Sequence, residues 1–153
     1  MATKNFQPQL QRFEQICKGA GLKVTHQRLE IYRELLAAHD HPSAEAIYKR
    51  LEKRLPSLSL DTVYRTLATF EQLKLVYRIE TVESQARYEA FTARHHHFLC
   101  KTCSQVFDFT WHHFDTMQLP DDLNTIGAVD HANVVVHGIC AACAQSKEKT
   151  CTI

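Results

Sequence analysis

The chain of 153 residues is 44% hydrophobic and 23% charged, and its formal net charge is +1. This composition is that of an ordinary globular protein with one domain or two small ones, and it excludes a disordered chain. No apolar run approaches the ~20 residues that span a bilayer, and residues 1–13 lack the apolar segment of a secretory signal, so we expect a cytoplasmic protein without a membrane partner.

The small net charge hides an asymmetry along the chain. Residues 1–80 hold 13 Lys and Arg against 9 Asp and Glu, whereas residues 81–153 hold 5 against 8. Seven of the ten histidines and five of the six cysteines also follow residue 80. A basic first half and a ligand-rich second half favour two domains with different partners, although a charge difference of this size can also arise by chance.

The first half has the pattern of four helices. Apolar residues at positions 10–17 fall at helical spacing, and this stretch ends at Gly19. Thr25, Ser43 and Ser59 are typical N-cap residues, and each precedes a further segment with helical periodicity. We therefore expect helices that begin just after these three positions.

The fourth of these helices carries Val63, Leu67 and Phe70 on one face, which leaves Tyr64 and Arg65 on other faces. A short capped helix, a turn, and a helix with polar and aromatic residues near its start form the layout of a helix-turn-helix, whose second helix enters the DNA major groove. Because many soluble helical pairs share this pattern, the pattern alone leaves DNA binding open.

The chain then changes to short strands. Residues 75–79 and 86–89, on either side of Glu83-Ser84-Gln85, predict a hairpin of the kind that forms the wing of a winged helix. Further strands are expected at 98–100, 106–109 and 133–136, with a helix between them near 112–118 or 121–126. We place the domain boundary so that residues 1–85 form the first domain and residues 86–153 the second.

Two CxxC motifs lie in the second half, Cys100–Cys103 and Cys140–Cys143, with 36 residues between them. Each CxxC turn presents two thiolates to one ion, and two such turns complete the tetrahedral sulfur site that zinc prefers. The site is structural, because four sulfurs leave no position for a substrate. Since each motif adjoins an expected strand, the ion would join the first and last strands of this domain and contribute to its folding. Redox-active dithiols are the alternative, and we assign no function to Cys17 or Cys151.

A second set of metal-binding residue types centres on the histidine run at 95–97, on an expected strand. Alternation along a strand places His95 and His97 on one face and His96 on the other. Carboxylates in the neighbouring strand and in the hairpin add oxygen donors, and a histidine of the first half would tie the two domains together. Such a mixed set suits Fe²⁺, Mn²⁺ or Zn²⁺, while a solvated histidine surface is the alternative. The candidate ligands are His41, Glu89, His95, His97 and Asp108.

Six segments, in order, resemble the ferric uptake regulator (Fur) family. They are G-L-K-V-T-H-Q-R at 21–28, H-P-S-A-E-A-I-Y at 41–48, S-L-D-T-V-Y-R-T-L at 59–67, H-H-H-F-L-C-K-T-C at 95–103, V-F-D-F at 106–109 and G-I-C-A-A-C at 138–143. The resemblance implies an α+β protein with an N-terminal winged helix-turn-helix domain and a C-terminal α/β dimerisation domain. It also implies a homodimer that binds a palindromic double-stranded DNA operator when it is loaded with metal.

The resemblance also implies a role for each candidate residue. The four CxxC cysteines match ligands of a structural Zn²⁺ ion, and the histidine and carboxylate candidates match a regulatory site for Fe²⁺ or Mn²⁺ between the domains. Thr62, Tyr64 and Arg65 lie on the implied recognition helix, and Lys23 matches a residue that approaches the minor groove. We hypothesise that the regulatory ion fixes the winged helices at the angle that fits successive major grooves.

A further metal site of many relatives is disrupted in this sequence. Its positions hold Arg94, His96, Asp115 and Ala132, of which Arg94 and Ala132 are poor or impossible ligands, and His131 lies one step away from Ala132.

Two positions of the sequence point to different branches of the family. Asp108 matches the peroxide-response repressors, whereas Glu89 points away from them. We predict a peroxide-sensing repressor, with an iron-uptake or zinc-uptake repressor as the alternative. A metal-dependent hydrolase with Glu89 as general base lacks an HExxH or comparable motif, and a zinc-stabilised protein-interaction module is a further alternative. We therefore expect no enzyme and assign no catalytic residue.

Overall fold

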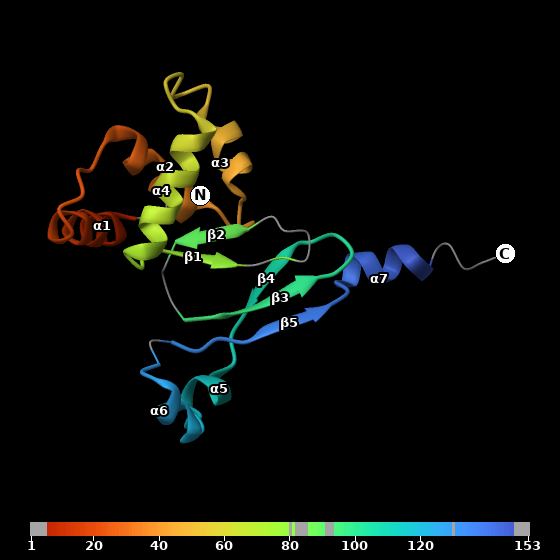
Figure 1. Ribbon diagram of the computed structural model, residues 1–153. Coiled ribbons are helices and arrows are strands. Elements are labelled where there is room, and N and C mark those ends of the chain that lie inside the picture. The colour runs from red at the N-terminus through yellow and green to blue at the C-terminus, as the bar shows by residue number, and fades with distance from the viewer. Residues whose placement is uncertain (1–5, 80, 82–85, 91–93, 130, 149–153) are drawn as a thin grey trace. The chain divides into compact units, whose positions relative to one another are not determined.

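The structure is a computed structural model that describes residues 6–79, 81, 86–90, 94–129 and 131–148. The chain divides into two compact units, residues 1–92 and 93–153 (Figure 1), and each unit has its own helices and its own sheet. The predicted α+β fold class is confirmed. Within the described ranges, no helix is both long enough and apolar enough to cross a membrane.

The first unit begins with four helices: α1 (Gln7–Gly19), α2 (His26–Ala37), α3 (Ala44–Leu51) and α4 (Leu60–Gln72). Thr25, Ser43 and Ser59 cap α2, α3 and α4, because each hydroxyl accepts a hydrogen bond from the backbone N–H three residues later. Such a cap satisfies a donor that the first helical turn leaves unpaired and contributes about 1 kcal/mol. All three predicted caps are therefore confirmed.

The buried face of α4 fixes how this helix sits in the first unit. Val63, Leu67 and Phe70 are fully buried, as their spacing predicts. The Phe70 ring stands edge-on to Phe13, with 5.3 Å between ring centroids, and the Phe13 ring stacks on Tyr32 at 4.4 Å. Because each large apolar side chain that is buried contributes about 1.5–3 kcal/mol, α4 is held at one rotation about its axis. The exposed residues of α4 are Asp61, Tyr64, Arg65, Ala68, Glu71 and Gln72.

A two-stranded antiparallel hairpin completes the first unit. β1 (Val76–Ile79) and β2 (Arg87–Ala90) pair over their whole length. The Tyr88 backbone N–H donates a hydrogen bond to the Pro42 carbonyl at 3.0 Å, which fastens the hairpin to the segment before α3. Because β2 pairs with β1, the two units divide after residue 92, a few residues beyond the boundary that we placed at 85–86. The predicted turn at 83–85 lies outside the described residues.

The second unit is built on a three-stranded sheet with the order β4-β3-β5. The central strand β3 (His96–Cys100) runs antiparallel to β4 (Val106–Phe109) and parallel to β5 (Val135–Gly138). Two short helices, α5 (His112–Thr116) and α6 (Asp122–Ile126), lie between β4 and β5, and α7 (Ala141–Glu148) follows β5. The last strand begins two residues after the predicted start at 133. α7 was not predicted, because its second half, from Gln145 onward, has the polar composition of a tail.

Candidate metal centres and nucleic-acid interface

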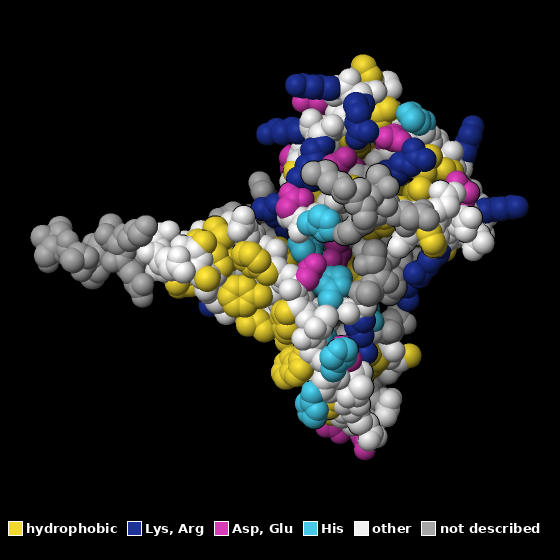
Figure 2. Space-filling model, turned by 180° about the vertical axis from the view of Figure 1, so that it is seen from behind, with side chains coloured by type: hydrophobic (Ala, Val, Ile, Leu, Met, Phe, Trp, Pro, Cys, Tyr) yellow, Lys and Arg dark blue, Asp and Glu magenta, His cyan; other side chains and the backbone are white. Residues whose placement is uncertain are grey.

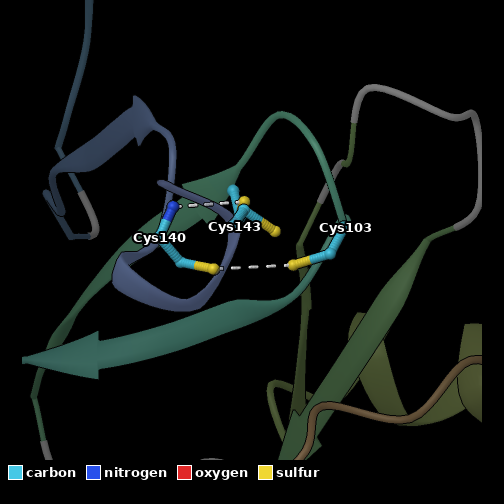
Figure 3. Close-up of side chains that lie close together, drawn as sticks. Cys103, Cys140 and Cys143 are labelled. Atoms are coloured by element: carbon cyan, nitrogen blue, oxygen red, sulfur yellow. Dashed lines mark hydrogen bonds between the residues drawn. The ribbon is translucent and has the colours of Figure 1, made fainter. Parts of the chain in front are cut away.

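The four CxxC cysteines form one cluster in the second unit. Their sulfur atoms all lie within 4.8 Å of one another. Cys103 Sγ and Cys140 Sγ are 3.8 Å apart, and Figure 3 shows the sulfurs of Cys103, Cys140 and Cys143 directed toward a common centre. Four sulfurs held 2.3 Å from a tetrahedral zinc ion lie about 3.8 Å apart, so this arrangement fits zinc.

The sheet brings the two CxxC motifs together. Cys100 ends β3 and lies opposite Gly138 of the parallel strand β5, so both motifs leave the sheet at the same end. The Lys101 backbone N–H donates to the Gly138 carbonyl at 2.8 Å, and the turn after Cys100 closes through Ser104, whose φ is 57°. The first and last strands of the second unit therefore lie side by side, which places the two motifs where one ion could bind both.

The protonation of these thiols also fits a cation site. Backbone N–H donors of Cys140 and Cys103 lower the pKa of Cys100 to about 6, so this sulfur is a thiolate at neutral pH. The neighbouring Cys140 thiol, together with desolvation and the other two sulfurs, raises the pKa of Cys143 to about 12. Repulsion between neighbouring thiolates thus disfavours ionisation of all four sulfurs at once. A bound divalent cation would offset this repulsion and favour the ionised form.

A histidine–carboxylate pair lies in the first unit. His41 Nε2 is 3.1 Å from Glu89 Oε2, and the exposed fractions of the two side chains are only 4% and 12%. His41 has a φ of 48°, in the left-handed region that non-glycine residues seldom adopt, and strain of this kind is often found at functional sites. The pair is held in place because β2, which carries Glu89, is bonded through Tyr88 to the residue after His41.

A second donor set lies in the second unit. Asp108 of β4 lies directly opposite His97 of β3, and its Oδ1 atom is 3.7 Å from His97 Nε2 and 3.6 Å from His95 Nε2. These distances are too long for hydrogen bonds and slightly longer than the roughly 3.0–3.4 Å between ligand atoms that share an ion. The rings of His95 and His97 lie 4.9 Å apart, which confirms that these two histidines share one face of the strand.

His96 points to the other face of the same strand, where its ring lies beside a carboxylate that also pairs with Arg94. Its Nε2 atom lies 3.2 Å from Asp115 Oδ1, and the Arg94 Nε atom lies 2.8 Å from the same oxygen. Arg94 Nη2 also donates to the Ala132 carbonyl at 3.1 Å. The four positions of the disrupted metal site thus come together around a guanidinium group, and His131 is exposed nearby in the sequence.

The exposed face of α4 is the candidate nucleic-acid interface. The exposed fraction of the Arg65 side chain is 80%, and its guanidinium lies 2.9 Å from Asp61. The Tyr64 hydroxyl donates a hydrogen bond to Glu45 of α3. The Thr62 hydroxyl bonds to Ser59 at 2.8 Å and so supports the start of the helix. Sequence reasoning did not single out Glu45, since nothing in the sequence shows which residue of α3 faces Tyr64.

The first unit carries an excess of basic residues. Lys23 is exposed in the segment before α2, and its carbonyl accepts a hydrogen bond from Arg28 at 2.7 Å. Figure 2 shows Lys and Arg side chains over the helices of the first unit, whereas hydrophobic side chains gather on the visible face of the second unit. A basic helical surface is suited to the phosphate backbone of a nucleic acid.

A winged helix-turn-helix followed by a unit with a four-sulfur cluster defines a class of metal-responsive DNA regulators. The model of the ferric uptake regulator family matches residues 19–127. The chain belongs to this family, so it is a metal-responsive transcriptional regulator and not an enzyme. Family members bind operator DNA as dimers, and this chain has a four-cysteine structural zinc site and a histidine–carboxylate regulatory site.

Individual relatives agree with this family assignment. The chain is 30% identical over 126 residues to the peroxide-responsive repressor PerR of Staphylococcus epidermidis, with 82% of this chain and 84% of that protein covered. It is also similar to a solved structure of the Pseudomonas aeruginosa ferric uptake regulator with manganese (TM-score 0.68, 30% identity, 84% and 97% covered). A structure of the Helicobacter pylori ferric uptake regulator has a TM-score of 0.74 at 23% identity, with 92% and 95% covered, and shows the fold alone.

Proposed function

We propose that this chain is a homodimeric, metal-dependent repressor that binds a double-stranded DNA operator in the cytoplasm and releases it in response to peroxide. The observation that carries the proposal is that each unit holds part of a nitrogen and oxygen donor set. His41 and Glu89 form one part, and His95, His97 and Asp108 form the other. Such a divided set can couple metal binding to the arrangement of the two units.

The residues that would hold the regulatory ion are those five, and their mixed donors suit Fe²⁺ or Mn²⁺. An ion bound by both parts would supply a cross-link between the DNA-binding unit and the dimerisation unit. In the first unit His41 pairs with Glu89, and in the second unit Asp108 lies beside two imidazoles. We infer that the cross-linked arrangement is the one with high operator affinity, because a ligand can shift an equilibrium only by binding one state better.

The proposed contacts with DNA come from the first unit. Tyr64 and Arg65 would enter the major groove from the exposed face of α4, with Thr62 at the start of that helix, and Lys23 would approach the minor groove. An exposed guanidinium can donate to a guanine edge or to a phosphate. Lys23 and the other basic residues of this surface would supply the salt-dependent part of the affinity.

The proposed dimer uses an apolar face of the second unit. Strand register places Phe107 and Val136 on either side of Phe98, on one face of the sheet. Phe107 is 42% exposed and Val136 is 38% exposed. A row of exposed apolar side chains supports an interface with a second copy of the chain. Phe107→Asp should therefore shift the protein toward the monomer in sedimentation experiments.

Metal dependence is tested by operator binding of the full chain with and without Mn²⁺, Fe²⁺ and Zn²⁺. The operator is first selected from a random duplex library with the metal-loaded protein. The paired substitution of His95 and His97 by alanine should abolish the response to added metal, because it removes both imidazoles of the second donor set. The matched control replaces His112 and His113, two exposed histidines of α5, and should leave the response unchanged. Equal responses of the two variants would contradict the proposal.

Peroxide sensing is supported by the similarity to the Staphylococcus epidermidis repressor and by Asp108. A bound iron ion would supply the redox chemistry that activates peroxide beside its ligands. Hydrogen peroxide would oxidise a His41 or His95 ring by two electrons, so that one peroxide oxygen is inserted into a ring C–H bond to give C–OH, while the O–O bond breaks and the other oxygen leaves with two hydrogens as water. The oxidised ring is a weaker donor, so metal and operator would be released.

Mass spectrometry of iron-loaded protein after brief peroxide exposure tests this step. One added oxygen is expected on a peptide that contains His41 or His95, together with loss of operator binding. Manganese-loaded protein is the control and should remain unmodified. Unmodified peptides in the iron-loaded protein, with operator binding retained, would favour an iron-uptake or zinc-uptake repressor instead.

A further inference from the structure

The hydroxyl of Tyr64 is engaged by a carboxylate from another helix. Tyr64 lies on the exposed face of α4, and its side chain is 44% exposed. Its hydroxyl donates a hydrogen bond to Glu45, a half-buried residue in the first turn of α3. Ser43 caps α3, and the buried faces of α3 and α4 belong to one core, so both ends of this contact stand on rigid elements.

We propose that Glu45 is a positioning residue for DNA recognition, which holds the Tyr64 ring at one orientation on the surface of α4 that meets the operator. This inference rests on the proposed function. A half-exposed tyrosine has several staggered side-chain orientations open to it. A hydrogen bond from its hydroxyl to a charged acceptor selects one of them, because charge-assisted hydrogen bonds are the stronger kind.

The protonation states of the pair favour a lasting contact. The hydrogen bond to Tyr64 lowers the pKa of Glu45, and the hydrogen bond to Glu45 raises the pKa of Tyr64. The carboxylate is therefore ionised and the phenol neutral at neutral pH. In that state, the tyrosine hydroxyl has a proton to donate and the carboxylate has oxygen atoms to accept it.

The charge of Glu45 makes the proposal testable. A carboxylate close to DNA repels phosphate, so its removal should by itself raise the affinity for any duplex, whatever the sequence. A positioning role predicts that removal of Glu45 lowers the affinity for the operator and not for other duplexes. The reason is that a Tyr64 ring without a fixed orientation makes weaker contacts with the operator base pairs. The ratio of operator affinity to affinity for a scrambled duplex separates these two effects.

The experiment measures this ratio by fluorescence anisotropy with the manganese-loaded full chain and its selected operator. Glu45→Ala should lower the ratio about tenfold, because one specific contact with a base pair contributes discrimination of about that order. Glu45→Gln removes the charge but keeps a carbonyl that accepts the tyrosine proton, so its ratio should stay close to that of the wild type. Tyr64→Phe, which keeps the ring and loses the hydroxyl, should behave like Glu45→Ala, and the double variant should lose nothing further.

Glu71→Ala is the matched control, since Glu71 is an exposed carboxylate near the other end of α4. It should leave the ratio unchanged. If Glu45→Ala and Glu45→Gln change the ratio equally, or if Tyr64→Phe retains the wild-type ratio, the positioning role is refuted. If the wild-type chain enriches no sequence with any metal, the proposed function fails instead, so the two failures are distinguishable.

Discussion

Replacement of Cys143 by serine should unfold the second unit while the first unit stays folded. The substitution removes one of the four clustered sulfurs, and a serine hydroxyl is a poor replacement for a thiolate ligand of zinc. We expect loss of the ion to unfold this unit, because a single copy of the second unit buries few apolar side chains. The extended core cluster, from Phe13 to Ala90, belongs entirely to the first unit.

The magnitudes follow from the buried side chains. In the described part of the second unit, the buried aliphatic side chains are Leu99, 2% exposed, and Val106, 8% exposed. At about 1.5–3 kcal/mol each, they contribute roughly 3–6 kcal/mol. A structural zinc ion contributes about 10–16 kcal/mol at neutral pH in small zinc domains, which exceeds that contribution. Small units with few buried apolar groups depend on such metal sites.

Trp111 provides the assay, because it is the only tryptophan of the chain and lies in the second unit. Its ring lies beside Phe114 of the same unit, with 5.8 Å between ring centroids, so its emission reports the unfolding of this unit. Far-ultraviolet circular dichroism reports mainly the helices of the first unit. In a urea titration, Cys143→Ser should lose the Trp111 transition and retain the helical one, and bound zinc should be absent by elemental analysis.

Cys17→Ala is the matched control, since Cys17 is a fully buried cysteine of the first unit. It should shift the helical transition and leave the Trp111 transition in place. A zinc-free Cys143→Ser protein that keeps the wild-type urea midpoint for Trp111 emission would refute the reasoning that the ion holds this unit together.

Three further predictions concern single side chains. Phe70→Ala should destabilise the first unit by about 3–5 kcal/mol, because it removes a fully buried ring, and a loss below ~1 kcal/mol by urea titration would contradict its central position. Arg65→Ala should weaken operator binding by about 1–3 kcal/mol if the guanidinium donates to a base edge. If the guanidinium contacts a phosphate instead, the slope of log affinity against log salt concentration should decrease by about one. Arg94→Ala should lower the free energy of unfolding of the second unit by ~1 kcal/mol or less, because the guanidinium is half exposed, and should lower the urea midpoint of Trp111 emission accordingly. An unchanged midpoint would show that its contacts with Asp115 and Ala132 do not stabilise the unit.

The sequence was sufficient for features that depend on neighbours within a few residues. The caps at Thr25, Ser43 and Ser59 follow from a hydroxyl and an N–H three residues away. The separation of His96 from its two neighbours follows from strand alternation alone. The two CxxC motifs are equally local, because each turn brings its own pair of sulfurs together, and only zinc chemistry was needed to expect that the pairs meet.

Tertiary structure decided which distant side chains meet. Nothing near Tyr64 in the sequence indicates Glu45, since their contact depends on how α3 and α4 pack on the shared core. Arg94 reaches Asp115 and the Ala132 carbonyl only because α5 and the approach to β5 lie beside the start of β3. Packing sets such contacts through the combined shape of many buried side chains, whereas caps, alternation and motif spacing are set by the geometry of a single segment.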